Sequence, residues 1–166
     1  MPNFMTGWHL LYTRPHQEAK VSGQLLDKEI RTYLPVMKEK RKWSDRIKTI
    51  QVPIFPSYLF VYLNNSQEFY EGTKADGSCY YVRFGTRVAR MSEEGIGQIR
   101  MIEANGINME VAENIFQAGQ VLAIQNGPLS GMTCEVIQHK GRNRILVRVS
   151  IINRSILADL PATAFS

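Results

Sequence analysis

The run Tyr58-Leu59-Phe60-Val61-Tyr62-Leu63 constrains the fold of this chain more than any other segment. Every side chain in it is apolar or aromatic, so both faces of an extended strand need to be covered. The run is far too short to span a bilayer as a helix. It therefore predicts a central strand that is packed on both sides inside a globular domain.

The segments around this strand differ between the two parts of the chain. Residues 1–103 contain both strand-like and helix-like patterns. Strands are expected at 7–13, 32–37, 47–52, 80–84 and 87–91, and helices at 15–29, 66–74 and 92–103. Residues 104–116 are polar and interleaved with Asn and Gly, which makes them the expected linker. The remainder reads as all-β, with strands at 121–124, 134–137, 144–149 and 155–160.

Short strands separated by turns at about ten-residue spacing are typical of a small barrel. The chain has 166 residues, enough for two small domains. We therefore expect an α+β fold, with one domain over 1–104, a linker over 105–116, and a small β-barrel over 117–166.

Charge is concentrated in one place. The net charge is +5 and the pI is near 9.3, but six basic residues against two acidic ones fall between Lys38 and Lys48. A solvated hairpin tip explains such a run. Trp43 in its middle favours a second interpretation, because an exposed indole can stack on a base while cations neutralise phosphates.

The sequence gives no reason to expect an enzyme or a cofactor. His9, His16 and His139 are scattered, and no metal-ligand spacing, nucleophile motif or phosphate-binding loop is present. We expect His9 to be a packed residue of its strand. The two cysteines, Cys79 and Cys134, and the lack of a secretory leader favour a reducing cytoplasm, with a disulfide between them as the alternative.

Four segments resemble the NusG family of transcription elongation factors. Residues 7–15 (Gly-Trp-His-Leu-Leu-Tyr-Thr-Arg-Pro) are similar to the opening strand of its N-terminal domain, and residues 52–61 carry its F-P-x-Y-x-F-V strand. Residues 81–85 followed by 92–94 resemble its last hairpin and helix. Residues 119–131 resemble its KOW domain. The resemblance implies an N-terminal α/β sandwich followed by an SH3-like barrel, and it is closer to RfaH and UpxY-type antiterminators than to general NusG.

The resemblance also implies a docking site for the clamp helices of RNA polymerase. The matching positions are apolar or aromatic, and each could instead be a core residue: Tyr12, Phe55, Pro56, Tyr58, Phe60 and Phe84. Specialised members also read the displaced non-template DNA strand. Arg14 and His16 match that region, and the basic run adds Lys40, Arg41, Lys42, Trp43 and Arg46.

The tail departs from the family pattern at two positions. Cys134 stands where the KOW core carries a glycine, which would be costly if that position needed a positive φ. Ile152 stands where general NusG has the Phe that meets the ribosomal small subunit and Rho. Coupling to either partner is therefore uncertain from the sequence.

The resemblance implies a cytoplasmic factor that binds RNA polymerase and suppresses pausing or termination at particular operons. A general NusG-like factor and a KOW-type RNA- or ribosome-binding protein are the alternatives. No membrane contact is expected.

Overall fold

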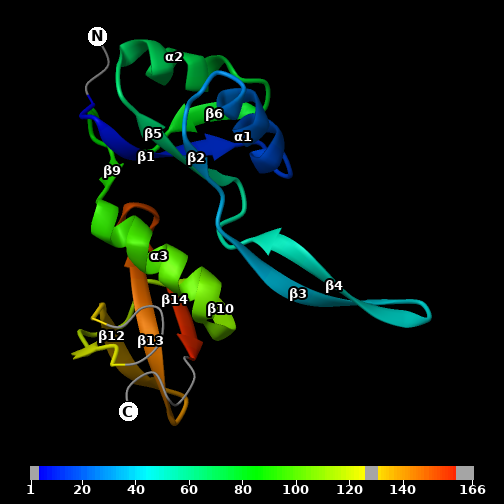
Figure 1. Ribbon diagram of the computed structural model, residues 1–166, viewed down its shortest axis with the longest axis vertical. Coiled ribbons are helices and arrows are strands. Elements are labelled where there is room, and N and C mark those ends of the chain that lie inside the picture. The colour runs from blue at the N-terminus through cyan, green and yellow to red at the C-terminus, as the bar shows by residue number, and fades with distance from the viewer. Residues whose placement is uncertain (1–3, 126–130, 160–166) are drawn as a thin grey trace. The chain divides into compact units, whose positions relative to one another are not determined.

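The computed structural model describes residues 4–125 and 131–159 (Figure 1). By its internal contacts the chain divides into two compact units, Met1–Glu93 and Glu94–Ser166. The first is mixed α/β and the second consists mostly of strands, as the sequence patterns indicate. The domain limits expected from the sequence stay a prediction, because the two units are defined by contacts alone.

An antiparallel sheet forms the centre of the first unit, with strand order β2-β5-β1-β6 and β9 paired to the end of β1. Its strands are β1 (Gly7–Thr13), β2 (Thr32–Tyr33), β5 (Tyr58–Leu63), β6 (Ser78–Tyr81) and β9 (Arg90–Met91). The strand expected at 58–63 is confirmed as an interior strand, held between β2 and β1. Its register with β1 runs from Gly7 opposite Leu63 to Tyr12 opposite Tyr58.

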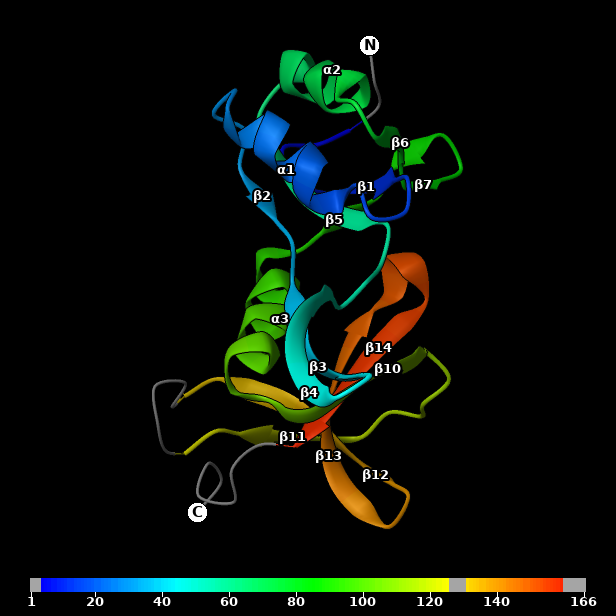
Figure 2. The same ribbon diagram turned by 90° about the vertical axis from the view of Figure 1, so that its right-hand side faces the viewer.

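Two helices, α1 (Glu18–Leu26) and α2 (Ser66–Lys74), lie on the same side of this sheet (Figure 2). The core beneath them is made of alternate strand residues and the apolar faces of the helices: Leu11, Val21, Leu25, Ile30, Leu59, Val61, Leu63, Phe69, Tyr81 and Val88. Asn65 caps α2 by accepting from the Glu68 N–H at 2.9 Å. The helix expected at 66–74 is therefore confirmed at both ends.

The first helix is shorter than expected at both ends. It was expected over 15–29 with Pro15 as its first residue, but it occupies Glu18–Leu26. His16 has φ 64° and Glu29 has φ 61°, so the backbone is left-handed just outside each end. Pro15 belongs to a turn instead. Glu18, almost fully buried, accepts from the Ser57 N–H at 2.7 Å and ties the helix to the turn before β5.

The strand expected at 32–37 is divided in two. Leu34 and Pro35 separate β2 from the next strand, because proline has no N–H to donate to a ladder. The hairpin expected over 80–91 is also divided. A short pair, β7 (Arg83–Phe84) and β8 (Arg87–Val88), forms its tip, while β6 and β9 both pair with β1.

His9 is fully buried in β1, as expected for a packed strand residue. Its ring nitrogens lie within hydrogen-bond distance of two backbone carbonyl oxygens, Ala89 O at 2.8 Å and Met5 O at 2.6 Å. The side chain thus joins the start of the chain to the segment before β9.

A long two-stranded hairpin leaves the sheet between β2 and β5 (Figure 1). It consists of β3 (Val36–Trp43) and β4 (Arg46–Pro53), which pair from Val36 opposite Pro53 to Trp43 opposite Arg46. The basic run therefore lies on two regular strands, with Ser44 and Asp45 as its turn. The basic side chains are thus spread along the hairpin and are not confined to its tip.

The second unit begins with α3 (Glu93–Asn105), followed by a five-stranded antiparallel sheet of order β10-β14-β13-β12-β11. The strands are β10 (Ile107–Glu113), β11 (Gln120–Ala123), β12 (Thr133–His139), β13 (Arg142–Val149) and β14 (Arg154–Asp159), with a short 3-10 turn, η1 (Ser150–Ile152). The four strands expected here are present, although the turn expected from the sequence at 126–128 and Leu160 lie outside the described residues. Residues 107–113, expected to be linker, instead form β10 and pair with β14.

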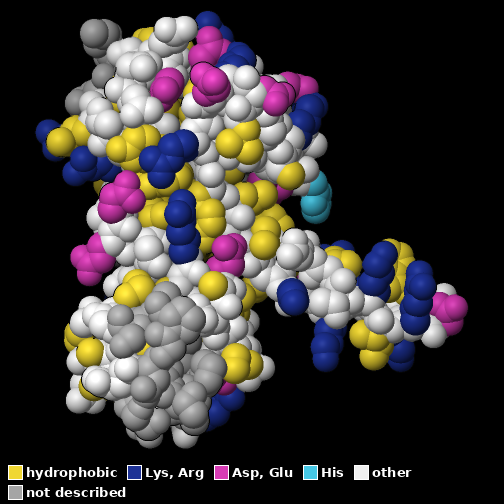
Figure 3. All heavy atoms as spheres, viewed as in Figure 1, with side chains coloured by type: hydrophobic (Ala, Val, Ile, Leu, Met, Phe, Trp, Pro, Cys, Tyr) yellow, Lys and Arg dark blue, Asp and Glu magenta, His cyan; other side chains and the backbone are white. Residues whose placement is uncertain are grey.

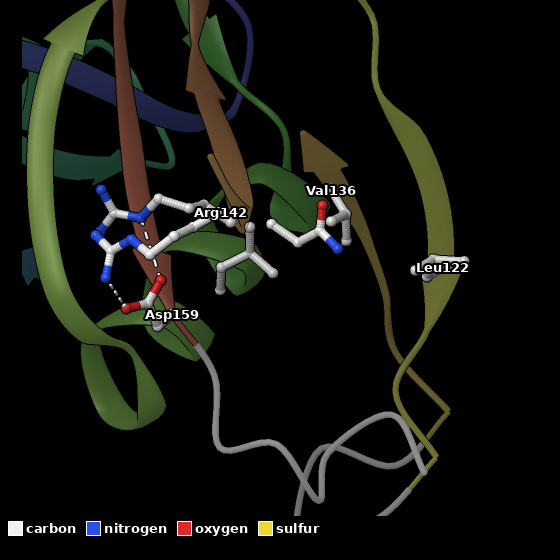
Figure 4. Close-up of a pocket in the computed structure, with 7 residues that line it drawn as sticks. Leu122, Val136, Arg142 and Asp159 are labelled. Carbon is white, nitrogen blue, oxygen red and sulfur yellow. Dashed lines mark hydrogen bonds and ion pairs between the residues drawn. The ribbon is translucent and has the colours of Figure 1, made fainter. Parts of the chain in front are cut away.

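Arg144 is the buried polar centre of this sheet, with its side chain 2% exposed. Its guanidinium donates to Glu110 Oε2 at 2.7 Å, to Asp159 Oδ1 at 3.2 Å and to the Asn108 carbonyl. Arg142 approaches the same carboxylate of Asp159 from the surface at 3.3 Å (Figure 4). The hydrogen bond from Asn108, followed by the charges of Arg142 and Arg144, lowers the pKa of Asp159. These contacts fasten β10 to β13 and β14.

Candidate functional site

The face of the first sheet opposite α1 and α2 is lined by aromatic side chains. Strand alternation places them there, because residues directly opposite in antiparallel strands share a face. Trp8 stands opposite Tyr62, Leu10 opposite Phe60, and Tyr12 opposite Tyr58. Tyr33 and Tyr80 extend the row through their own pairings. We call this set the aromatic face: Trp8, Leu10, Tyr12, Tyr33, Tyr58, Phe60, Tyr62 and Tyr80.

The rings of the aromatic face contact one another across the strands. Tyr12 meets Tyr58 edge to face with centroids 5.3 Å apart and stacks on Tyr80 at 5.1 Å. Phe60 stacks on Tyr33 at 6.1 Å. At the other end, Trp8 and Tyr62 form a second edge-to-face pair at 5.4 Å. Such pairs hold large apolar side chains in fixed orientations.

Exposure varies along this face. Leu10 and Phe60 are buried, Tyr12 and Tyr58 are half-buried, and Tyr80 is 58% exposed. A cation borders the far end, where the Arg31 guanidinium lies 4.7 Å from the centroid of Tyr62 and 5.3 Å from that of Trp8. Tyr33 and Tyr62 are half-buried as well. Among the rings with accessible surface, Tyr58 and Tyr80 both contact Tyr12, so these three form one group.

The β3–β4 hairpin is the second candidate surface. Lys and Arg side chains are visible on both sides of it, together with apolar ones near its end (Figure 3). Trp43 is 55% exposed, and Arg41 donates to Glu39 Oε2 at 3.3 Å. Of the predicted nucleic-acid contacts, this hairpin brings together Lys40, Arg41, Lys42, Trp43 and Arg46.

The comparisons with known proteins decide the family. The family model described as transcription termination factor NusG matches residues 6–100, more than half of the chain. The chain belongs to the NusG family. It is thereby placed among transcription factors that act during elongation.

One solved structure agrees with this assignment at the level of the fold. The NusG of Thermotoga maritima is matched with a TM-score of 0.53 and 14% identity, over 97% of this chain and 96% of that one. Two conformations of the MjSpt4:Spt5 complex are matched with TM-scores of 0.34 and 0.35 and identities of 14% and 16%. These cover 92% and 93% of this chain and 99% of each of those chains.

The residues matched to the polymerase-docking site of the NusG family fall in three places. Tyr12, Tyr58 and Phe60 belong to the aromatic face. Phe55 is buried, and Pro56 is exposed in the turn that leads into β5. Phe84 lies elsewhere, 58% exposed at the tip of β7, where it lines a hollow of about 280 Å³ with Phe4 and Met5.

Arg14 and His16, matched to the DNA-facing region, lie in the turn between β1 and α1 and not on the hairpin. Arg14 donates to Asp76 Oδ1 at 3.5 Å, and Lys20 donates to Asp76 Oδ2 at 2.6 Å. The hydrogen bond from Lys20, followed by its charge, lowers the pKa of Asp76. Arg14 therefore shares Asp76 with Lys20, whereas His16 is exposed in the turn before α1.

The tail substitutions fit the local backbone. Cys134 is buried in β12 and is not among the residues with positive φ, so no strain attends the replacement of glycine there. Burial raises the pKa of its thiol. Cys79 is exposed and both cysteines are free, which contradicts a disulfide between them. Ile152 is half-buried at the end of η1.

A hollow of about 450 Å³ in the second unit is lined in part by Leu122, Val136, Arg142 and Asp159 (Figure 4). Its carboxylate is already engaged by two arginines, so the lining offers apolar surface and an ion pair rather than a catalytic group. Among residues 4–125 and 131–159, no group of His, Cys, Asp and Glu is arranged to hold a metal ion. No helix in the same ranges is long and apolar enough to cross a membrane.

Sequence reasoning missed five of the eight residues of the aromatic face as site residues. Trp8, Leu10, Tyr33, Tyr62 and Tyr80 were not proposed as site residues. Period-two alternation within 7–13 places Trp8 on the same face as Tyr12, and alternation within 58–63 places Tyr62 on the same face as Tyr58. That signal was available from the sequence. The membership of Tyr33 and Tyr80 depends on which strands pair, which the sequence does not state.

Proposed function

We propose that this NusG-family factor binds the clamp helices of RNA polymerase through its aromatic face and suppresses pausing or termination. The observation that carries the proposal is the division of the first sheet into two faces. One face is covered by α1 and α2, whereas the other carries a row of rings, of which Tyr12, Tyr58 and Tyr80 keep accessible surface. Aromatic side chains in a shallow apolar surface are typical anchors for a partner helix.

The accessible rings are the expected anchors. Tyr12, Tyr58 and Tyr80 form one contiguous group, supported by the buried Phe60 and Leu10 beside them. An anchor of this kind contributes about 2 kcal/mol or more to binding. Because docking stabilises one conformation of the polymerase, the effect on pausing needs no chemistry from the factor.

Operon specificity is the finer part of the proposal. The basic hairpin supports contact with the displaced non-template DNA strand, a feature implied by the resemblance to RfaH and UpxY-type antiterminators. In the tail, which we propose to be a KOW-like barrel, Ile152 in place of the family's Phe supports weakened coupling to the ribosomal small subunit or Rho. Action in the cytoplasm follows from these partners.

Docking is tested by binding of core RNA polymerase to Tyr12→Ala and Tyr58→Ala variants, singly and combined. The matched control is Tyr70→Ala, which removes a 46%-exposed tyrosine from α2 on the other side of the sheet. Each aromatic-face variant is expected to bind about thirtyfold more weakly, and the control as wild type. Phe60 is avoided because its removal would open a cavity in the core.

Equal affinity for polymerase in the folded double variant and in Tyr70→Ala would overturn the docking proposal. A KOW-type RNA- or ribosome-binding protein, the alternative, would instead bind RNA or ribosomes unchanged in both. Antitermination is measured separately, as read-through of a terminator in a purified transcription reaction. A general NusG-like factor would act there without regard to upstream DNA sequence.

A further inference from the structure

The two faces of the β3–β4 hairpin carry different kinds of side chain. Pairing puts Trp43 opposite Arg46 and Arg41 opposite Lys48, and alternation keeps both pairs on one face. We call these four residues the Trp43 face. The other face, which we call the lysine face, carries Lys38, Lys40 and Lys42 opposite Gln51, Thr49 and Ile47.

The Trp43 face combines a ring with cations. The indole is 55% exposed, and three cationic side chains occupy the positions around it. Successive pairs on one face are about 7 Å apart, so Arg41 and Lys48 lie within one side-chain length of the ring. Glu39 shares this face and accepts from Arg41, which holds that guanidinium along the strand.

The lysine face has the same number of cations but lacks a ring among its six residues. Its apolar member near the tip is Ile47, which is 69% exposed. Ammonium groups on alternate residues can neutralise phosphates of any nucleic acid, single- or double-stranded. This face therefore offers charge without a stacking platform.

We propose that the Trp43 face binds single-stranded nucleic acid by stacking one base on Trp43 while Arg41, Arg46 and Lys48 contact the flanking phosphates. A duplex cannot use the ring, because its bases are already stacked on one another. The lysine face then adds electrostatic attraction that does not distinguish strands. This rests on the nucleic-acid contact of the proposed function and deepens it by naming the face of the hairpin and the ring that would select a single strand.

The first test compares Trp43→Ala with Ile47→Ala, which truncates the exposed apolar residue of the opposite face. Affinities of the full chain are measured by fluorescence anisotropy with labelled oligo-dT and oligo-rU of about 12 nucleotides and with a duplex of equal length. Trp43→Ala is expected to weaken single-strand binding between about fivefold and a hundredfold and to leave duplex binding unchanged. Ile47→Ala is expected to change neither.

A second test compares two variants that lose the same number of positive charges. The triple variant Arg41→Gln, Arg46→Gln, Lys48→Gln and the triple variant Lys38→Gln, Lys40→Gln, Lys42→Gln each remove three cations from the same hairpin. The first is expected to weaken single-strand binding about tenfold more than the second. Both should weaken duplex binding to a similar extent.

Intrinsic fluorescence gives an independent readout. Trp8 is 1% exposed, so quenching of tryptophan emission by added oligonucleotide reports on Trp43. Trp43→Phe should keep most of the single-strand affinity while losing the quenching. Unchanged thermal unfolding of each variant shows that the fold is retained.

The proposal is overturned if Trp43→Ala and Ile47→Ala behave alike, if Trp43→Ala weakens duplex and single strand equally, or if the two triples weaken single-strand binding equally. The oligo-dT and oligo-rU arms separate a DNA ligand from an RNA one. No polymerase is present in these measurements. Failure of docking by the aromatic face therefore leaves their outcome unaffected, and the two proposals fall separately.

Discussion

Gly72 of α2 packs directly on the hydroxyl of Tyr81, because a Cβ at Gly72 would lie 1.9 Å from that oxygen. The Tyr81 ring stacks on Phe69 at 4.5 Å, and its hydroxyl donates to the Phe69 carbonyl at 3.3 Å. Burial of this group raises the pKa of Tyr81. The absence of a side chain at Gly72 thus lets α2 approach β6 closely.

We therefore expect Gly72→Ala to lower the free energy of unfolding by about 1–3 kcal/mol, because the added methyl overpacks the core. Gly23→Ala in α1 is the matched control, since a Cβ there meets nothing within 4 Å. That change should raise stability by about 0.5–1 kcal/mol through better helix propensity. Urea unfolding monitored by circular dichroism measures both changes. A Gly72→Ala protein as stable as wild type would contradict the packing described.

The edge-to-face contact of Tyr12 and Tyr58 predicts an energetic coupling between them. In a double-mutant cycle with Tyr12→Leu and Tyr58→Leu, measured by the free energy of unfolding, the coupling between the two changes should be about 0.5–1.5 kcal/mol. Pairing Tyr12→Leu with Tyr70→Leu on the other side of the sheet should give additive effects. Additivity in the first cycle would mean that the two rings contribute only by burial.

Arg144 and Arg142 contact the same carboxylate from different depths, which predicts unequal costs for their loss. Arg144→Met leaves Asp159 and Glu110 without their buried cation and should cost about 3 kcal/mol or more. The Arg142 side chain is 55% exposed, so Arg142→Ala should lower the free energy of unfolding by less than about 1 kcal/mol. Thermal unfolding of the two variants decides between this ordering and equal contributions.

The ion pair between Glu135 and Arg148 predicts an acid dependence of stability. Hydrogen bonds from the Arg148 side chain, and then one from the Gly119 N–H, hold the pKa of Glu135 below its ordinary value of 4.5. Folding therefore favours the ionised carboxylate, and this stabilisation is complete above pH 4.5 and lost as the pH falls through the lowered folded-state pKa.

Glu135→Gln should accordingly be less stable than wild type at neutral pH, with the difference shrinking as the solution is acidified below pH 4.5. Unfolding free energies measured by urea titration across this range supply the comparison. A difference that stays constant with pH would show that the ionisation of Glu135 is not linked to folding.

Local patterns were sufficient for the elements whose residues carry their own signals. The strand at 58–63 is apolar on both faces, and the helix at 66–74 follows a capping Asn65. They failed where the backbone turns unexpectedly, as at His16, or where a strand is defined by its partner. β10 (Ile107–Glu113) has apolar residues at Ile107, Met109 and Val111 between polar ones, but the Asn and Gly before it obscured that pattern, and its pairing with β14 defines it as a strand.

The candidate site shows the same division. Sequence alone proposed Tyr12, Tyr58 and Trp43 as site residues, through their residue types and the family resemblance, and they stay predictions. It did not separate the cations of the hairpin into two faces, because that depends on the register set by the turn at Ser44 and Asp45. The family is established by comparison, while docking, strand preference and tail partners stay predictions.

The hairpin of β3 and β4 pairs with itself and contributes no strand to the five-stranded sheet of its unit. We therefore expect substitutions along its outer part to leave the five-stranded sheet and its aromatic face largely undisturbed. Under the two proposals above, exchange of this one hairpin between relatives would change the nucleic-acid preference of the factor and leave polymerase docking as it was.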